Sequence, residues 1–196
     1  MPIPPSDVKP TDEALQTRKQ ALREQLLALR AAMPQRTQHE QVLANRTRRW
    51  LATMPATRLG FYWPVRGECD LTSVVTHWLA DNPDRLAALP RVNGDLLRFV
   101  AWDPQTSMQA DTYGIPAPPA TAPQIAPQVL LIPCVGVDRN RYRLGYGGGY
   151  YDRTLATLTP RPVLVGICFD LGRVKNLAPQ AHDIRMDLVI TESGVL

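Results

Sequence analysis

The feature of this sequence that most limits its fold is a pair of almost uninterrupted apolar runs, VLLIPCVGV at residues 129–137 and PVLVGICF at residues 162–169. Runs without polar alternation predict strands that are buried on both faces, as in parallel sheets. Residues 150–158, between the two runs, predict a crossover helix. The chain is therefore expected to form an α/β fold with a mostly parallel central sheet covered by helices on both faces, and ligands in such folds gather at the carboxyl ends of the strands.

Apolar periodicity places the other elements. Helices are expected from Thr11 to about Met33, from Arg36 to Met54 and from Asp70 to about Leu79. Further strands are expected at residues 57–64, 85–92, 96–102 and 187–191, and the proline-rich residues 116–127 predict a surface loop without regular structure. Because 196 residues suit one hydrophobic core, we expect a flexible segment at residues 1–10 and a single α/β domain over residues 11–196.

Composition excludes several classes of protein. With 44% hydrophobic and 20% charged residues, the chain is expected to be globular rather than disordered or fibrous. No apolar run is long enough to span a membrane, and the N-terminus has no secretory or transit pattern, so no membrane association and a cytoplasmic location are expected. The three cysteines are odd in number and far apart, which predicts reduced, packed thiols.

The net charge of +4 attracts anions without identifying them. Nucleotides, polycarboxylates and nucleic acid all fit this charge. The arginine-rich helices suggest an RNA-associated domain, but the sequence has no nucleic-acid motif and its positive charge is spread over several segments, so a nucleic-acid partner is disfavoured.

The segment RLGYGGGYYDR, residues 143–153, follows a predicted core strand and opens a predicted helix. Glycines let the backbone approach a ligand closely, and free amides at a helix start favour anions. Arg143 offers a planar fork for phosphate, Tyr150 and Tyr151 offer rings and hydroxyls, and Asp152 offers a hard oxygen for Mg²⁺. The segment is neither a Walker A loop nor a GxGxxG motif. It predicts a phosphate-binding loop, and the alternative is a plain glycine turn between a strand and a helix.

Three basic residues of the first helix, Lys19, Arg23 and Arg30, lie along one edge of its apolar stripe. Two interpretations are open at this point. The side chains either reach into a cleft beside the core, or form a solvated edge whose aliphatic stems cover apolar surface.

The sequence resembles the 5-formyltetrahydrofolate cyclo-ligase family, also called 5,10-methenyltetrahydrofolate synthetases. The family signature is Pro, four residues, Asp, a short turn, and then Arg-Leu-Gly-Arg-Gly-x-Gly-Tyr-Tyr-Asp. The positions that match are Pro133, Asp138, Arg143, Leu144, Gly145, Gly147, Gly149, Tyr150, Tyr151 and Asp152. Ordered matches elsewhere, from residue 19 to about residue 192, are Lys19, Leu22, Arg23, Glu68, Tyr113 to Pro116, and Asp183.

This resemblance implies a single-domain, Rossmann-like three-layer fold and an ATP- and Mg²⁺-dependent ligase. The implied reaction converts 5-formyltetrahydrofolate into 5,10-methenyltetrahydrofolate through a phosphorylated formyl group, an iminium phosphate, with release of ADP and phosphate. The implied partners are these small molecules, and the protein is expected to be a monomer or a weak homodimer. The alternative is a diverged nucleotide- or folate-binding relative without turnover.

The resemblance also implies roles for individual residues. Arg143 and Tyr151 would be catalytic, and Asp152 and Asp183 would serve Mg²⁺. The implied ATP-binding residues are Lys19, Arg23, Arg143, Leu144, Gly145, Tyr146, Gly147, Gly148, Gly149, Tyr150 and Tyr151. The implied folate-binding residues are Trp63, Glu68, Tyr146, Gly147, Gly148, Gly149 and Tyr150.

Alternatives stay open for three of these residues. Glu68 could complement a helix start, Asp183 could be a turn residue, and Trp63 could be plain core. The sequence also departs from the family pattern. Tyr146 stands where the family usually has Arg, which removes one positive charge that would face phosphate. Arg141 replaces a common turn glycine, and we expect Asn140 to take the left-handed conformation in its place.

Overall fold

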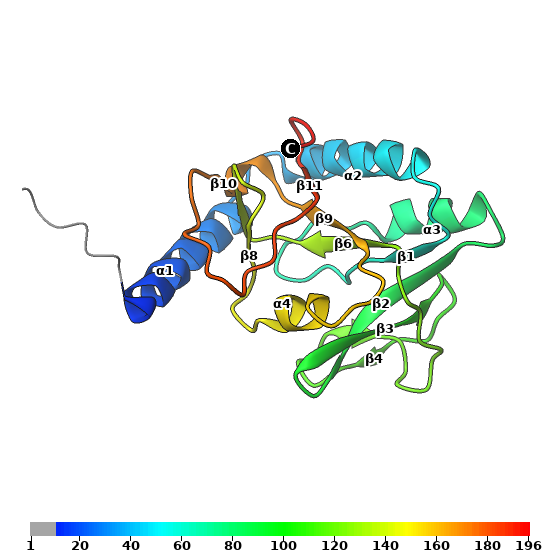
Figure 1. Cartoon of the computed structure of the whole chain (residues 1–196). Helices are drawn as coiled ribbons and strands as arrows, with labels where there is room; N and C mark the ends of the chain where they lie inside the picture. Colours follow the sequence, from blue (N-terminus) through cyan, green and yellow to red (C-terminus); the bar gives the residue numbers. More distant parts are fainter. Residues whose placement is uncertain (1–10) are drawn as a thin grey trace, which may run out of the picture.

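The computed structural model describes residues 11–196, so the flexible segment expected at residues 1–10 lies outside the described residues. At its centre is a six-stranded sheet in the order β11-β9-β6-β1-β2-β3 (Figure 1). The strands are β1 (Arg58–Gly60), β2 (Leu86–Asn93), β3 (Leu96–Trp102), β6 (Val129–Pro133), β9 (Val163–Ile167) and β11 (Leu188–Ile190). All neighbours are parallel except the antiparallel pair β2 and β3, which confirms the expected α/β fold.

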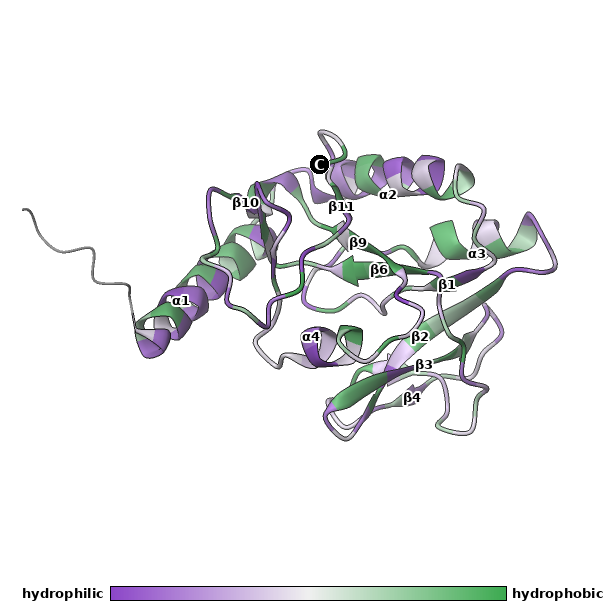
Figure 2. Cartoon of the chain, viewed as in Figure 1, coloured by the Kyte–Doolittle hydropathy of each residue, from purple (hydrophilic) through white to green (hydrophobic). Residues whose placement is uncertain are grey.

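Helices cover both faces of this sheet, and the strand side chains explain why. The helices are α1 (Asp12–Ala31), α2 (Arg36–Ala52), α3 (Thr72–Ala80) and α4 (Tyr150–Leu155). Helices α2 and α3 lie over one face and α4 over the other (Figure 1). Along β6, Val129 and Leu131 pack in the cluster with α2 and α3, whereas Leu130 and Ile132 pack in the cluster with α4. A strand covered on both faces needs apolar residues at every position, as Figure 2 shows for β6.

Helix α1 begins where local chemistry predicts. The Thr11 hydroxyl accepts from the amide of Ala14 at 3.3 Å, and the acidic residues Asp12 and Glu13 occupy the first turn. Arg30 lies in the last turn, where a cation complements the exposed carbonyls. Within residues 11–196, no helix is long and apolar enough to cross a bilayer.

The apolar run 129–137 does not form one strand as expected. Strand β6 ends at Pro133, and the chain then enters β7 (Gly136–Asp138), the centre of a second sheet in the order β10-β7-β8. The other strands of this sheet are β8 (Arg143–Leu144) and β10 (Arg173–Val174). Consecutive amides change partner at the break: Cys134 donates to Ile167 in β9, and Val135 donates to Leu144 in β8. The change of sheet is therefore set by long-range pairing, which hydropathy does not encode.

Two element boundaries and one predicted loop also differ from the expectations. The strand expected at 57–64 is only three residues long, and residues 61–67 instead lead the chain out to Glu68. Helix α4 ends at Leu155 rather than residue 158. The stretch 116–127 is not wholly irregular, because Pro116–Ala117 (β5) pairs with Gln109–Ala110 (β4). Proline is compatible with such an edge pair because it lacks only the donor.

Candidate functional site

The predicted site residues converge at the carboxyl ends of the central parallel strands. The chain leaves β1 toward Glu68, and it leaves β6 through β7 and β8 toward the glycine loop, which we define as residues 145–149. Arg23 and Arg30 of α1 make hydrogen bonds to the glycine loop, and Lys19 of α1 makes one to Asp183, which precedes β11. In a parallel sheet all these strand ends lie at the same edge.

A buried carboxylate supports the hairpin that carries the glycine loop. Asp138 is 1% exposed, and it accepts from the amides of Asn140 at 2.9 Å, Tyr142 at 3.0 Å and Leu177 at 3.2 Å. The left-handed residue of this turn is Arg141, with φ of 68°, so the expectation for Asn140 is wrong. The Asn140 amide is held by the Asp138 side chain, and the next residue completes the turn with its amide on the Asp138 carbonyl.

The glycine loop leaves its backbone donors available. Among residues 11–196, no protein acceptor receives a hydrogen bond from the amides of residues 145–149. Gly147 and Gly149 have φ of 96° and 67°, which side chains rarely adopt, so glycine is required at both positions. Gly147 and Gly148 are exposed and the other three residues are half-buried, so an anion from solvent can reach these amides and accept from them. Because α4 has only six residues, we attribute anion affinity to these loop amides and not to the helix.

Arg143 does not offer the free fork that the sequence suggests. Its two terminal nitrogens donate to the two carboxylate oxygens of Asp152 at 3.0 and 2.8 Å, and its side chain is only 6% exposed. The guanidinium also lies 5.5 Å from the centre of the Tyr151 ring. Asp152 accepts a further bond, from the amide of Ile184 at 3.0 Å. Arg143 is thus placed to orient Asp152.

The basic edge of α1 reaches into the site, so the solvated-edge interpretation is wrong. Arg23 and Arg30 are both buried. Arg23 donates from Nε to the carbonyl of Gly145 at 2.7 Å, and its guanidinium lies beside Gly147. Lys19 donates to Asp183 at 2.7 Å. Although burial raises the pKa of Asp183, the bonds from Lys19 and the Gln180 amide outweigh it and lower that pKa below its usual value.

The two predicted metal ligands lie on adjoining segments, because Asp152 accepts from the amide next to Asp183. No group of three metal-binding side chains occurs in residues 11–196. Each carboxylate nevertheless keeps one oxygen with spare acceptor capacity. Within the described part of the chain, Asp152 Oδ2 accepts only from Arg143, and Asp183 Oδ1 only faces His182 at 3.7 Å. Carboxylate oxygens with spare capacity are ligands of the kind that Mg²⁺ uses when nucleotide phosphates and water supply the rest.

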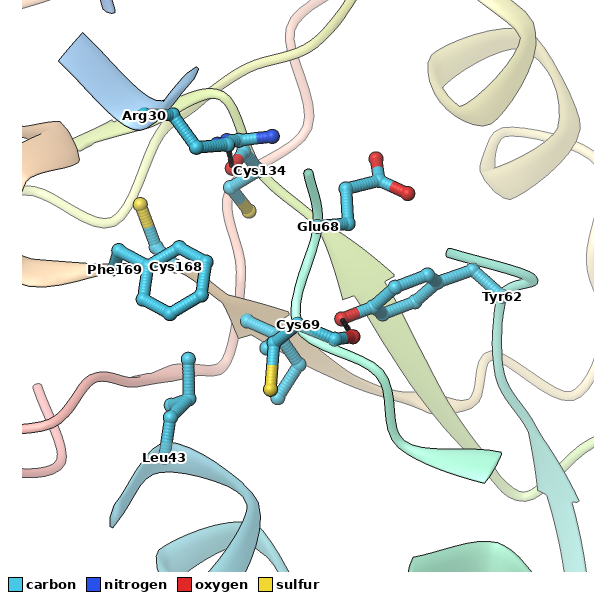
Figure 3. Close-up of a pocket in the computed structure, with 9 residues that line it drawn as sticks. Arg30, Leu43, Tyr62, Glu68, Cys69, Cys134, Cys168 and Phe169 are labelled. Carbon is cyan, nitrogen blue, oxygen red and sulfur yellow. Dashed lines mark hydrogen bonds between the residues drawn. The ribbon is translucent and has the colours of Figure 1, made fainter. Parts of the chain in front are cut away.

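Glu68 is a buried carboxylate that contacts the glycine loop. It is 5% exposed and accepts from the Val65 amide at 2.9 Å and the Tyr146 hydroxyl at 2.8 Å. Arg30, at 2% exposure, donates to Tyr146 at 3.2 Å and to the carbonyl of Cys134 at 2.5 Å. Figure 3 shows the Arg30 side chain pointing toward the Glu68 carboxylate. Burial raises the pKa of Glu68 to about 7, although the Val65 amide, Tyr146 and Arg30 act in the opposite direction.

The helix-start alternative for Glu68 is not what the structure shows, because Asp70 receives the first-turn amide of Thr72. Asp183 does close a turn, since it accepts from the amide of Gln180, but it also pairs with Lys19. Trp63 is half-buried and packs against the core cluster under α2 and α3, as its plain-core alternative predicts.

The two tyrosines after the glycine loop point in different directions. Tyr151 is inward and packs on the α4 cluster, and burial raises its pKa. Tyr150 forms a hydroxyl–hydroxyl hydrogen bond with Tyr113, with ring centres 5.8 Å apart, and Arg153 lies 5.0 Å from its ring centre.

Sequence reasoning left three residues out of the proposed site. Tyr113 was signalled by the TYGIP stretch, and Arg30 by its place on the basic edge of α1. Arg66, which lies 5.4 Å from the centre of the Tyr146 ring, had no sequence signal.

The structure also has a groove away from the candidate site. A groove of about 710 Å³ is bounded by α3, the start of β2, the end of β3 and residues 119–123. It lies at the amino end of the parallel strands, because it is lined by Leu86 and Ala87 at the start of β2. The converging charged groups described above are absent from its lining, so we place the candidate site at the opposite edge.

Comparisons with known proteins show which family the chain is similar to. A model of the 5-formyltetrahydrofolate cyclo-ligase family matches residues 15–192. The 5-formyltetrahydrofolate cyclo-ligase of Haemophilus influenzae is 26% identical over 175 residues, covering 85% of this chain and 94% of that protein. The enzyme of the same name from Mycoplasma pneumoniae is 28% identical over 181 residues, covering 89% and 98%.

Two solved structures extend the similarity to three dimensions. The 5,10-methenyltetrahydrofolate synthetase of Aquifex aeolicus gives a TM-score of 0.75 at 26% identity, over 90% of this chain and 91% of that one. The synthetase of Mycoplasma pneumoniae gives a TM-score of 0.68 at 26% identity, over 88% and 97%.

Proposed function

Because the chain belongs to the 5-formyltetrahydrofolate cyclo-ligase family, we propose that it uses ATP and Mg²⁺ to convert 5-formyltetrahydrofolate into 5,10-methenyltetrahydrofolate. One observation carries this proposal: a glycine loop, whose amides have no protein acceptor among residues 11–196, contacts both the cations of α1 and a buried carboxylate, Glu68. The loop suits nucleotide phosphates, and the carboxylate suits the N–H groups of a pterin ring.

The proposed chemistry explains why both subsites must adjoin. An amide oxygen is a poor leaving group, so the formyl oxygen of the substrate attacks the γ-phosphate of ATP, ADP leaves, and the oxygen becomes a phosphate ester. N10 then bonds to the formyl carbon and loses its proton, and phosphate departs with the former formyl oxygen. The protein has to align the two substrates and stabilise charge on the transferring phosphoryl group.

Residues of α1 and the glycine loop supply the phosphate subsite in this proposal. The amides of residues 145–149 would receive phosphate oxygens, with Arg23 fixed against the loop by its bond to Gly145. Lys19 would contribute its ammonium group beside Asp183. Asp152 and Asp183 would hold Mg²⁺, which neutralises phosphate charge when bound.

The roles of Arg143 and Tyr151 are more indirect than the sequence suggests. Arg143 is already engaged by both oxygens of Asp152, so we propose that it orients this metal ligand and does not hold phosphate with its whole fork. The Tyr151 ring packs under that guanidinium and supports the pair.

The folate subsite is proposed at Glu68 and the outer side of the glycine loop. Glu68 would accept N–H bonds from the pterin, and Tyr150 with Tyr113 would present aromatic surface beside the loop. Trp63 packs against the core cluster under α2 and α3, so we assign it a supporting role and no direct contact with the folate. This site uses four cations, which are Lys19, Arg23 and Arg30 of α1 and Arg143 of β8. All four are buried or paired, which disfavours an RNA-binding surface built from them.

The test is an absorbance assay of methenyltetrahydrofolate formation by the purified full chain. We expect product to form with 5-formyltetrahydrofolate, ATP and Mg²⁺ together and not when any one is omitted. Calorimetric titration with Mg-ATP and with folate should accompany it. Tight binding without product would identify a diverged, non-catalytic relative, and absence of both would reject the proposed site.

A further inference from the structure

The hydrogen bonds that join Arg30, Tyr146 and Glu68 have a fixed direction. Arginine can only donate, so the Tyr146 oxygen accepts from Arg30 at 3.2 Å. The single hydroxyl hydrogen of Tyr146 must then serve its other contact, the Glu68 Oε1 atom at 2.8 Å. Glu68 Oε2 meanwhile accepts from the Val65 amide at 2.9 Å. Both carboxylate oxygens are therefore held as acceptors.

This direction favours the ionised carboxylate. Two donors on the carboxylate stabilise its charge, and Arg30 strengthens the donor ability of the hydroxyl between them. Each oxygen keeps a further lone pair, so a pterin can still bring N–H donors to an oriented anion. Without the hydroxyl, Glu68 would lose one of its two anchors and could turn.

Tyr146 also belongs to the glycine loop itself. Its neighbour Gly145 is held by the Nε of Arg23 at 2.7 Å, and a side-chain carbon at Gly147 would lie 3.4 Å from the same guanidinium. Because Tyr146 is part of this loop, a shift of the loop backbone on phosphate binding would move the residue whose hydroxyl contacts Glu68. One residue thus contacts both proposed subsites.

We propose that Tyr146 is a positioning residue for Glu68: its hydroxyl, polarised by Arg30, favours the ionised carboxylate and holds it turned toward the folate, and its backbone couples this contact to the nucleotide loop. The folate part of this inference rests on the proposed function. The link between Tyr146 and Glu68 does not.

Other groups around Glu68 also affect its ionisation. They are the same in the wild-type chain and in a variant that lacks only the Tyr146 hydroxyl, so they do not account for a difference between the two. Arg66 lies over the Tyr146 ring and favours the anion, while burial disfavours it. The neighbouring groups that are neutral at ordinary pH are Tyr62, Tyr151, Cys69 and Cys134.

The experiment compares the wild-type chain with Tyr146→Phe, which removes only the hydroxyl. Carbon NMR of the Glu68 side-chain carboxyl, assigned with Glu68→Gln, gives its titration in the unliganded protein. Wild-type Glu68 is expected to titrate near pH 7, and the midpoint in Tyr146→Phe is expected to rise by about one pH unit. An unchanged midpoint would overturn the proposal.

Folate binding, followed by protein fluorescence at pH 6.5 and pH 8.5, provides the second measurement. Since the variant holds less of its Glu68 as the anion at the lower pH, its folate Kd should be raised about tenfold at pH 6.5 and less at pH 8.5. The Kd for Mg-ATP alone should change less than the folate Kd. Equal losses for both ligands at both pH values would indicate a merely structural effect and would also overturn the proposal.

Tyr142→Phe is the matched control. It makes the same chemical change four residues away, in the turn of the hairpin that carries the glycine loop. Among residues 11–196, the Tyr142 hydroxyl has no hydrogen bond. It should leave the Glu68 titration and the folate Kd unchanged. If the wild-type chain binds no folate, the proposed function fails, and the NMR titration still decides whether Tyr146 controls Glu68.

Discussion

Two arginine–aspartate pairs of this protein have nearly the same geometry and different burial. Arg143 and Asp152 meet through two bonds of 3.0 and 2.8 Å with side chains 6% and 18% exposed. Arg161 and Asp187 meet through two bonds of 3.0 Å with side chains 52% and 37% exposed. Because removing one member of a buried pair strands the other charge, burial should decide the cost.

We therefore expect Arg143→Ala to lower the free energy of unfolding by about 2 to 3 kcal/mol. Arg161→Ala should lower it by about 0.5 kcal/mol or less, since water screens that pair. Urea denaturation of both variants at pH 7.5 measures the difference. Equal losses would show that Arg143 does not act as a buried partner of Asp152.

Glu68 illustrates how a site residue can cost stability. Its pKa is about 7 in the folded chain against an ordinary value of 4.5, because burial penalises the charged form. Between these two pH values the unfolded chain releases the proton first, so the folded state loses stability as the pH rises. Below pH 4.5 both states are protonated and the penalty disappears.

The corresponding prediction concerns Glu68→Gln, which cannot ionise. Relative to the wild-type chain, the variant should gain stability as the pH rises from 4.5 to 7, by about 3 kcal/mol at most. Its turnover should fall. Urea denaturation at pH 5 and pH 8 tests the stability, and a difference between variant and wild type that is the same at both pH values would contradict the burial argument.

At the scale of elements, the glycine loop depends on α1 as much as on its own conformation. Gly147 has φ of 96°, and a side chain there would meet the Arg23 guanidinium at 3.4 Å. Gly94, in the turn between β2 and β3, has φ of 59° and open space around it. A side chain would strain the backbone at both positions, but only at Gly147 would it also meet a neighbouring group.

We expect Gly147→Ala and Gly94→Ala each to lower the free energy of unfolding by about 1 kcal/mol, because both place alanine in the left-handed region. Only Gly147→Ala should raise the Kd for Mg-ATP, roughly fivefold, through displacement of Arg23. Denaturation and calorimetric titration of both variants separate strain from site damage. Equal ATP affinities would contradict the assignment of Arg23.

At the scale of the whole molecule, the free amides of residues 145–149 contrast with the ladders of the central sheet. Amides without acceptors exchange quickly with solvent, whereas those of central strands open only with larger unfolding. The amino-end groove near Leu86 and Trp102 is lined by one cation, Arg85, and one carboxylate, Asp103, and by none of the cations of the candidate site. Ligand binding should therefore be visible at one end of the sheet only.

Hydrogen exchange measured by mass spectrometry tests this expectation. Mg-ATP should slow exchange in residues 145–149 by at least about tenfold, because phosphate oxygens become acceptors for their amides. Peptides that line the amino-end groove should keep their rates. Protection of the groove without protection of the loop would move the nucleotide site away from the glycine loop.

Much of this protein was determined by local sequence. The all-apolar runs predicted strands covered on both faces, as Val129 to Ile132 alternate between two helical layers. The spacing of Lys19, Arg23 and Arg30 predicted one basic helix edge, and the glycine-rich segment predicted a loop at the strand ends. Such features depend on neighbours within a few residues, so periodicity and residue type encode them.

Only the tertiary structure decided which charges meet. Arg30 bonds to Cys134 and Tyr146, and Lys19 bonds to Asp183, across more than a hundred residues of chain. The same holds for the change of sheet after Pro133, where amides exchange partners from β9 to β8. These contacts form because folding brings distant segments together and buried polar groups must find partners there, a requirement that no local pattern records.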